Sequence, residues 1–135
     1  MPLQSRTISE IMSPVTHSIG DEQPLAEAEH RMHQHQIRHL PVMRGGVLVG
    51  IVSDRDLAMV ESLPGVDPKE VTVREAMTAE PYAVPPTASL RAVLREMADH
   101  KYGTVVIIDE GEHPVGIVTT TDALRLCVDL LDGGT

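Results

Sequence analysis

The sequence predicts a mixed α/β (α+β) protein built from two copies of one small unit. Residues 7–12 (Thr-Ile-Ser-Glu-Ile-Met) return as residues 72–77 (Thr-Val-Arg-Glu-Ala-Met), and residues 49–56 return as residues 115–122. The offset grows from 65 to 66 at one turn, which preserves the register on both sides. We expect repeats at residues 1–65 and 66–135, each with the order βαββα and a small three-stranded sheet packed with helices, related by pseudo-two-fold symmetry.

Composition limits the kind of core that the chain can form. Two copies of about 60 residues each lie near the size at which a lone unit buries too little surface, so each copy is expected to need the other. Hydrophobic residues make up 41% of the chain, but there is no Phe, no Trp and only two Tyr. The core is therefore predicted to be aliphatic.

Charge and cysteine content narrow the function classes. A net charge of -9 repels phosphate backbones and anionic membranes, and aromatic side chains that could stack on single strands are scarce. We therefore expect no nucleic-acid and no membrane partner. One cysteine excludes an internal disulfide, and residues 1–6 contain no apolar stretch of signal-peptide length. A cytoplasmic protein is the expectation.

The first half of the first copy combines a lead-in with a helix. Residues 7–12 favour a short helix, and residues 15–19 form an extended run. Pro24 suits the first position of a helix that should reach about residue 36. Its core face repeats at helical spacing with Leu25, Ala28 and Met32.

A β-hairpin and a second helix complete the first copy. Residues 40–43 and 47–53 have strand composition, and the turn between them contains Gly45 and Gly46. Residues 54–63 return to a helical pattern and stop before a linker rich in Pro and Gly.

The second copy repeats this order. We expect a lead-in at 72–77, an extended run at 82–84, a helix at 89–100, strands at 104–109 and 115–119, and a closing helix to about residue 131. The helix at 89–100 should bury Leu90, Val93, Leu94 and Met97. Residues 105–108 are apolar at consecutive positions, so both faces of that sheet should be covered.

The end of each predicted hairpin carries a motif that resembles a known family. Residues 50–56 (Gly-Ile-Val-Ser-Asp-Arg-Asp) and 116–122 (Gly-Ile-Val-Thr-Thr-Thr-Asp) are similar to the closing signature of cystathionine β-synthase (CBS) domains. The lead-ins at Met12-Ser13 and Met77-Thr78 and the segment at 39–42 (His-Leu-Pro-Val) agree with that family. The second copy departs from the family pattern, because residues 104–107 (Thr-Val-Val-Ile) contain no counterpart of Pro41. The match covers nearly the whole chain, which therefore resembles a stand-alone tandem CBS pair.

The repeated motif has a chemistry suited to a ribose phosphate. Ser53 and Thr119 are expected where a strand meets a helix, and unpaired N–H groups there attract anions. Asp56 and Asp122 are acceptors suited to ribose hydroxyls. The further predicted phosphate-binding residues are Arg55, Thr120 and Thr121. The alternative interpretation is a capping box, in which the same side chains satisfy only their own backbone.

The resemblance also implies a base pocket in each copy, between the early extended segment and the middle strand. In the first copy its residues would be Thr16, His17, Ile19, Arg38, His39 and Pro41. In the second copy they would be Tyr82, Ala83, Val84, Tyr102, Gly103 and Thr104. Taken singly, Ile19, Pro41 and Val84 fit an ordinary core better, and only as a set do they form pocket walls. We further predict that the second motif holds phosphate better, because Asp54 adds negative charge to the first motif. Arg55 is expected to help neutralise the bound anion there.

A histidine-rich stretch offers a second kind of site. His30, His33, His35 and His39 include pairs at helical spacing that could bind a transition metal. The intervening polar residues favour a solvent-facing helix surface instead, so we expect no metal.

No catalytic set emerges from the sequence. Cys127 lies among leucines of the closing helix, where a thiol usually packs, and no acid, base and nucleophile recur together. The chain is predicted not to be an enzyme and to require no cofactor.

Three functions follow. The resemblance implies a regulatory, energy- or metabolite-sensing module that binds AMP, ADP, ATP or S-adenosylmethionine in clefts between the repeats and transmits a conformational change to an unknown protein target. The alternatives are an interaction scaffold without ligand and a metal-responsive protein. Apolar residues in the helices at 57–63 and 123–131 also predict a homodimer, which CBS pairs commonly form.

Overall fold

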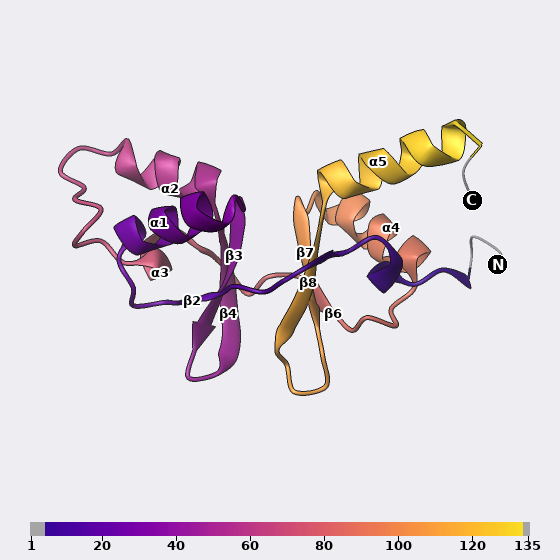
Figure 1. Ribbon diagram of the computed structural model, residues 1–135, viewed down its shortest axis with the longest axis horizontal. Coiled ribbons are helices and arrows are strands. Elements are labelled where there is room, and N and C mark those ends of the chain that lie inside the picture. Colours follow the sequence, from indigo (N-terminus) through magenta and orange to yellow (C-terminus); the bar gives the residue numbers. More distant parts are fainter. Residues whose placement is uncertain (1–4, 134–135) are drawn as a thin grey trace. The chain divides into compact units, whose positions relative to one another are not determined.

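The computed structural model describes residues 5–133 (Figure 1). The outer ends of the two predicted repeats, at residues 1 and 135, lie outside the described residues. The chain divides into two compact units, which we call the central unit (His17–Pro81) and the terminal unit (Met1–Thr16 with Tyr82–Thr135). Over residues 5–133, no helix is long and apolar enough to cross a membrane.

Each compact unit contains the lead-in of the other sequence copy. Ile8, from the lead-in of the first copy, is fully buried in the core of the terminal unit. Val73, from the lead-in of the second copy, is fully buried in the core of the central unit. The duplication that divides the sequence at 65/66 thus differs from the division into units, which falls at 16/17 and 81/82.

The central unit contains the βαββα order predicted for the first copy, followed by the lead-in of the second. Its elements are β2 (Ile19–Gly20), α1 (Leu25–His35), β3 (His39–Arg44), β4 (Val47–Ser53), α2 (Asp54–Glu61), α3 (Val73–Ala76) and β5 (Thr78–Ala79). The sheet order is β2-β3-β4-β5, with β2 parallel to β3 and the other pairs antiparallel. Figure 1 shows α1 and α2 on the same side of this sheet.

The core of the central unit follows the predicted helical stripe. Leu25, Ala28 and Met32 of α1 are all buried, and they pack in one cluster with Leu40 and Val52 of the sheet. Pro24 is the residue before the helix rather than its first residue, a difference of one position.

The terminal unit repeats the same arrangement with the lead-in of the first copy. Its elements are η2 (Ile8–Glu10), β1 (Ser13–Pro14), β6 (Ala83–Val84), α4 (Leu90–His100), β7 (Thr104–Ile108), β8 (Pro114–Thr119) and α5 (Thr120–Leu131). The sheet order is β1-β8-β7-β6. Leu90, Val93 and Met97 are buried as predicted, Leu94 is partly buried, and the consecutive residues 105–107 are all buried.

The α/β fold class is confirmed, but each sheet has four strands, not the predicted three. The fourth strand comes from the exchanged lead-in. β1 pairs with β8, and β5 pairs with β4, each through two residues. The short helices predicted for these lead-ins are present at residues 8–10 and 73–76, and the added strands follow the predicted ranges at residues 13–14 and 78–79. Pro14 is tolerated in β1 because this strand lies at the sheet edge, where a missing N–H breaks no ladder.

A methionine and a glycine fix each exchanged lead-in to its sheet. A Cβ atom added to Gly50 would lie 2.5 Å from the Sδ atom of Met77 and 2.9 Å from the carbonyl oxygen of Thr78. A Cβ atom added to Gly116 would overlap the Met12 side chain in the same way. The glycine that opens each repeated motif therefore leaves room for the methionine of the lead-in, which explains why both recur.

In the central unit, an ion-pair cluster fixes the lead-in of the second copy, and the terminal unit has no equivalent cluster among its described residues. The Asp21 carboxylate is buried and accepts hydrogen bonds from Arg44 Nε at 2.8 Å and from Arg74 Nη2 at 2.8 Å. The hydrogen bond from Arg44, with that from Arg74, lowers the pKa of Asp21. The equivalent positions in the terminal unit are Pro86 and Ser9, which cannot form this cluster.

Candidate nucleotide-binding corners

Each repeated motif forms a corner where a strand ends and a helix begins; we call these the central corner and the terminal corner. At the central corner, Ser53 ends β4 and precedes α2. Its Oγ atom accepts the N–H of Asp56 at 3.1 Å, and Asp56 Oδ2 accepts the N–H of Ser53 at 2.8 Å. This is a capping box.

The terminal corner has the same frame. Thr119 ends β8, its Oγ atom accepts the N–H of Asp122 at 3.3 Å, and Asp122 Oδ2 accepts the N–H of Thr119 at 2.7 Å. The Thr119 hydroxyl also donates to Asp122 Oδ2 at 3.0 Å. The capping interactions thus exist at both corners, but they use only one carboxylate oxygen. Within residues 5–133, Oδ1 of Asp56 and Oδ1 of Asp122 have no hydrogen-bond partner, so capping leaves an acceptor for a ligand.

The corners differ in the N–H groups that remain for an anion. The first N–H of each helix is taken by a carbonyl: Asp54 N–H donates to Arg38 and Thr120 N–H donates to Gly103. The next N–H, of Arg55, donates to Asp54 Oδ1 at 2.8 Å. Its counterpart, the N–H of Thr121, has no partner among the described residues. The central corner therefore has no free first-turn N–H, and the terminal corner has one.

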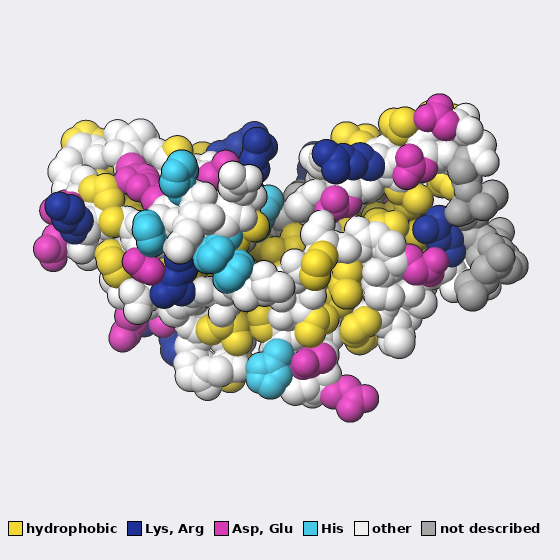
Figure 2. Space-filling model, in the orientation of Figure 1, with side chains coloured by type: hydrophobic (Ala, Val, Ile, Leu, Met, Phe, Trp, Pro, Cys, Tyr) yellow, Lys and Arg dark blue, Asp and Glu magenta, His cyan; other side chains and the backbone are white. Residues whose placement is uncertain are grey.

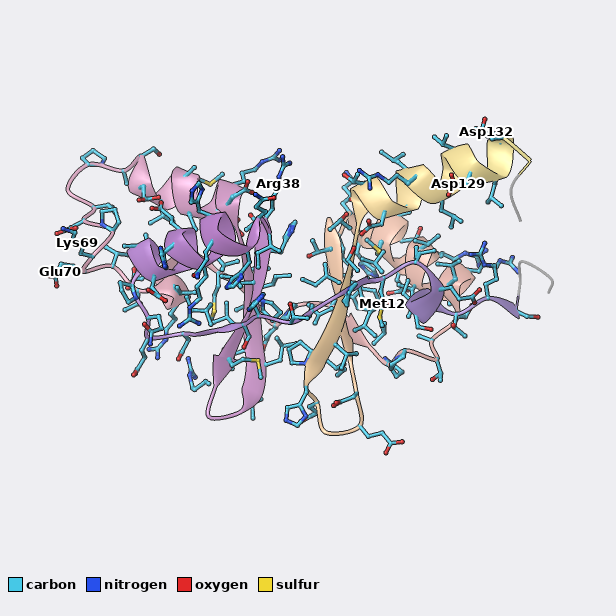
Figure 3. The ribbon with its side chains drawn as sticks, in the orientation of Figure 1. Met12, Arg38, Lys69, Glu70, Asp129 and Asp132 are labelled. Atoms are coloured by element: carbon cyan, nitrogen blue, oxygen red, sulfur yellow. The ribbon has the colours of Figure 1, made fainter. Side chains whose placement is uncertain are left out.

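The two corners differ in the charged side chains that they carry at equivalent positions. Arg38, Asp54 and Arg55 are exposed there, and none of them forms an ion pair with another described residue. The equivalent residues at the terminal corner are the uncharged Gly103, Thr120 and Thr121. The Thr120 hydroxyl donates to the Gly103 carbonyl at 3.2 Å. Figure 3 shows the Arg38 side chain beside the start of α2, where Figure 2 shows basic side chains gathered.

The sheet brings the predicted base-pocket residues next to these corners. His39 opens β3 directly opposite Ser53, and Thr104 opens β7 directly opposite Thr119. Ile19, Pro41 and Val84 are buried, and Ala83 pairs with Val106 in the sheet. Thr16 is exposed and directly precedes His17, at the boundary between the two units.

The early extended segments carry ring systems at equivalent positions. In the terminal unit, the ring of Tyr102 lies 5.2 Å from the ring of Tyr82 and 5.2 Å from that of His100, measured between centroids. Burial, with smaller effects from Glu96 and Tyr102, raises the pKa of Tyr82. In the central unit, the rings of His17 and His35 are stacked with centroids 3.6 Å apart.

Pro41 changes the backbone hydrogen bonding of the predicted base pocket. In the terminal unit, Val106 N–H donates to the Tyr82 carbonyl at 2.9 Å. The equivalent bond to the His17 carbonyl cannot form, because Pro41 has no N–H. The His17 carbonyl therefore does not receive this hydrogen bond, whereas the Tyr82 carbonyl does. The second copy, which has Val106 where the first has Pro41, thus uses a backbone acceptor that the first copy leaves without this donor.

The histidine-rich stretch does not converge on a metal site. His30, His33 and His35 are exposed, and His39 is half-buried in β3. Among residues 5–133, no group of three or more His, Cys, Asp or Glu side chains could hold a metal ion. The sequence did not predict that His35 would stack on His17, although the equivalent His100 lies beside Tyr102.

Cys127 is exposed, contrary to the expectation that it packs in the core. None of the residues of α5 is fully buried. Leu124, Val128 and Leu131 have exposed fractions of 60%, 54% and 85%, and they recur at helical spacing. These three residues of the closing helix form an exposed apolar stripe, which we call the α5 stripe.

Comparison with known proteins decides the family. A family model described as "CBS domain" matches residues 8–62 and 73–129. The chain belongs to the CBS domain family. Because the two matches lie in tandem and span most of the sequence, the chain is a CBS domain pair.

Similar CBS proteins occur among both sequences and solved structures. "CBS domain-containing protein YhcV" of Bacillus subtilis (strain 168) is 31% identical over 116 residues, which cover 86% of this chain and 81% of that protein. The crystal structure of Hypoxic Response Protein I with two coordinated zinc ions is 31% identical, with a TM-score of 0.72, covering 89% of this chain and 98% of that one. The CBS domain pair of protein MJ0100, in complex with 5′-methylthioadenosine and S-adenosyl-L-methionine, is 26% identical, with a TM-score of 0.75, covering 90% and 99%.

Proposed function

We propose that this CBS pair is a regulatory ligand sensor that binds adenosyl nucleotides at its two corners. The observation that carries the proposal is that both corners keep a carboxylate oxygen unpaired, next to a hydroxyl and a strand opening. The CBS pair of MJ0100, which has the same fold, was solved with two adenosyl compounds. Because capping needs only Oδ2 of each aspartate, it is compatible with ligand binding.

Each part of the ligand has a partner in this proposal. Oδ1 of Asp56 or Asp122 accepts hydrogen bonds from the ribose hydroxyls. The first phosphate accepts from the Ser53 hydroxyl with Arg55 at the central corner, and from Thr121 N–H at the terminal corner, with Thr119 and Thr120 beside it. The free Thr121 N–H supports the expectation that the terminal corner holds this first phosphate better.

The base would lie against the early extended segment. Tyr82 and Tyr102 offer ring faces for stacking at the terminal corner. At the central corner, the His17 carbonyl is an acceptor suited to the amino group of adenine, with His39 and Pro41 nearby in the sheet. Gly103 and Thr104 complete the opening of the terminal pocket.

The fold suggests how binding would reach a protein target. Ser53 and Gly50 belong to the same strand, and Gly50 packs against Met77 of the lead-in. A ligand that moves the end of β4 would therefore disturb this contact. Thr119, Gly116 and Met12 repeat the arrangement in the terminal unit. We propose that the lead-ins are the segments that report ligand binding.

Ligand titration tests the sensing proposal. Thermal unfolding would be measured with AMP, ADP, ATP, S-adenosylmethionine and 5′-methylthioadenosine. A ligand at a hundred times its dissociation constant should add about 2.7 kcal/mol to the free energy of unfolding. If no compound shifts unfolding, the interaction scaffold becomes the better interpretation.

The aspartates allow a sharper test at each corner. Asp56→Asn and Asp122→Asn keep an oxygen that can accept the capping N–H, but they place a donor where the ribose needs an acceptor. We expect each change to weaken binding at its own corner at least about tenfold, since hydrogen bonds to charged groups contribute roughly 1.5–3 kcal/mol. The matched ligand control is 2′,3′-dideoxyadenosine monophosphate, which should bind wild type weakly and lose little more in either variant.

We also propose that the chain forms a homodimer through its exposed helix faces. The α5 stripe supports this, together with Met59 and Leu63 in and after α2, which are 65% and 56% exposed. Leu124→Asp should shift the mass measured by light scattering from dimer to monomer. Val47→Asp changes an equally exposed apolar residue in the β3–β4 hairpin and should leave the mass unchanged. A monomeric wild-type chain at micromolar concentration would contradict the proposal.

A further inference from the structure

We propose that the two corners divide adenosyl ligands by charge: the central corner takes those with a polyphosphate chain, and the terminal corner takes those with at most one phosphate. This inference rests on the proposed function and adds the ligand class of each corner. It follows from side chains that differ between two corners with the same backbone frame.

Two arginines give the central corner its capacity for several phosphates. Arg38 lies directly before β3, and its carbonyl accepts the N–H of Asp54. Arg55 is the second residue of α2. Both are exposed, and neither forms an ion pair with a described residue. A guanidinium group can bind phosphate oxygens through two parallel hydrogen bonds, and these are roughly twice as strong as neutral ones.

Asp54 makes the same corner a poor place for a single phosphate. Its carboxylate accepts the Arg55 N–H at 2.8 Å and so occupies the position where an anion would otherwise bind the first turn. A phosphate next to the ribose would meet this negative charge. The distal phosphates would lie further from Asp54, and the long arginine side chains can reach them. Attraction therefore grows with the number of phosphates.

The terminal corner favours a single phosphate over a chain of several phosphates. Thr121 offers an N–H that has no partner in the described part of the chain, next to the proposed ribose ligand Asp122, and residues 119–121 carry no charge. One phosphate finds a donor there without meeting a carboxylate. The nearby basic residues, Lys101 and Arg125, lie outside the strand-to-helix corner, one in the turn that ends α4 and the other further along α5. Additional phosphates therefore gain little.

Site-resolved titration by NMR tests this division. The amides of residues 54–56 and 120–122 report the two corners separately during additions of ATP, AMP or 5′-methylthioadenosine. In wild type, ATP should bind the central corner at least about tenfold more tightly than AMP, and the terminal corner should favour AMP or bind both equally. Arg38→Gln with Arg55→Gln should remove about tenfold in ATP affinity at the central corner, with a much smaller change for AMP. Lys69→Gln removes one positive charge at the far end of the central unit and should change neither affinity (Figure 3).

A reciprocal exchange completes the test. Asp54→Thr with Arg55→Thr gives the central corner the terminal side chains, and Thr120→Asp with Thr121→Arg does the reverse. The preference for ATP over AMP should weaken in the first variant and appear in the second. Equal ATP-to-AMP ratios at both wild-type corners, or ratios that these changes do not move, would overturn the inference and leave the sensing function intact. If none of the three ligands perturbs either corner, the proposed function itself fails.

Discussion

The central and terminal units share one backbone plan but secure it with different side chains. Both use a capping box, a glycine–methionine contact and a lead-in from the other copy. Only the central unit has the Asp21 cluster, and only there does the closing helix bury a residue, Leu57 of α2. The equivalent residue of α5 is Ala123, and α5 packs Leu126 against the core while it exposes Leu124, Val128 and Leu131. The comparison shows that the two copies share the backbone frame of each corner, while the surrounding side chains differ.

The largest expected effect concerns the anchoring of the closing helices. Leu57→Ala should destabilise the central unit by about 2–5 kcal/mol, because it removes a side chain that is only 2% exposed. The terminal unit should be almost unaffected, and hydrogen exchange of amides in each unit measures the two separately. Val47→Ala, at a half-exposed position, should change stability by less than about 0.5 kcal/mol. Equal losses in both units would show that they unfold together and that the anchoring difference has no local effect.

The signature glycines should respond unequally to alanine. In Gly50→Ala the new methyl group meets the flexible Met77 side chain and also the Thr78 backbone carbonyl, which cannot move aside cheaply. In Gly116→Ala the three nearest atoms all belong to the Met12 side chain. We expect a loss of about 2–3 kcal/mol for the first and about 1 kcal/mol for the second, measured by urea unfolding.

Gly103→Ala is the control for the glycine pair, because no atom lies within 4 Å of the added Cβ. It should be close to neutral. The comparison fails if Gly116→Ala proves as damaging as Gly50→Ala, since the Thr78 carbonyl would then not be the decisive obstacle.

Most of the fold could be predicted because each repeated signal is local. The stripe Leu25, Ala28 and Met32 specifies a helix face, and the β-branched strands flank a glycine turn. The exchange of lead-ins could not be predicted in this way. Met12 and Gly116 recur as Met77 and Gly50, but the sequence contains no information on which methionine meets which glycine. That choice depends on contacts between residues far apart in the chain.

The corners were predicted in part for the same reason. A Ser or Thr three residues before an Asp specifies a local hydrogen-bond pattern, and the structure contains it. The sequence did not predict that Arg55 N–H would be occupied by Asp54 while Thr121 N–H stays free, because that depends on side-chain rotamers. Nor could the stacking of His17 on His35 be predicted, since it depends on how α1 ends against the extended segment.

The Asp21 cluster gives the central unit an acid-sensitive contact that the terminal unit lacks. Because the folded pKa of Asp21 is lowered, its stabilising contribution is present above the unfolded value of 3.8 and is lost as the pH falls through the folded pKa. Asp21→Asn should therefore loosen the central lead-in at neutral pH, and the difference from wild type should shrink below about pH 4. Hydrogen exchange at Val73 and Met77 measures this. If the difference in hydrogen exchange between wild type and Asp21→Asn stayed the same at low pH, the negative charge of Asp21 would not be its cause.

The smallest expected effect has the opposite pH dependence. A hydrogen bond with the Glu61 carboxyl, followed by burial and charge repulsion, raises the pKa of Glu29 to about 7. A raised pKa of an acid means that the folded state holds its proton more tightly, so stability falls as the pH rises from about 4.5 through about 7. Glu29 is exposed and screened by solvent, which limits the effect to less than about 1 kcal/mol.

Glu29→Gln tests this pair because the amide can still donate to Glu61 without competing for a proton. The variant should be more stable than wild type at pH 8 and nearly equal at pH 5, as measured by thermal unfolding at both values. Glu70→Gln, in the linker before α3, should show no such dependence (Figure 3). The terminal unit has Leu94 and Cys127 at the equivalent positions, so its amides should exchange with little added pH dependence over this range. If both units lose protection equally between pH 5 and pH 8, the carboxyl pair is not the cause, and this difference between the two units does not exist.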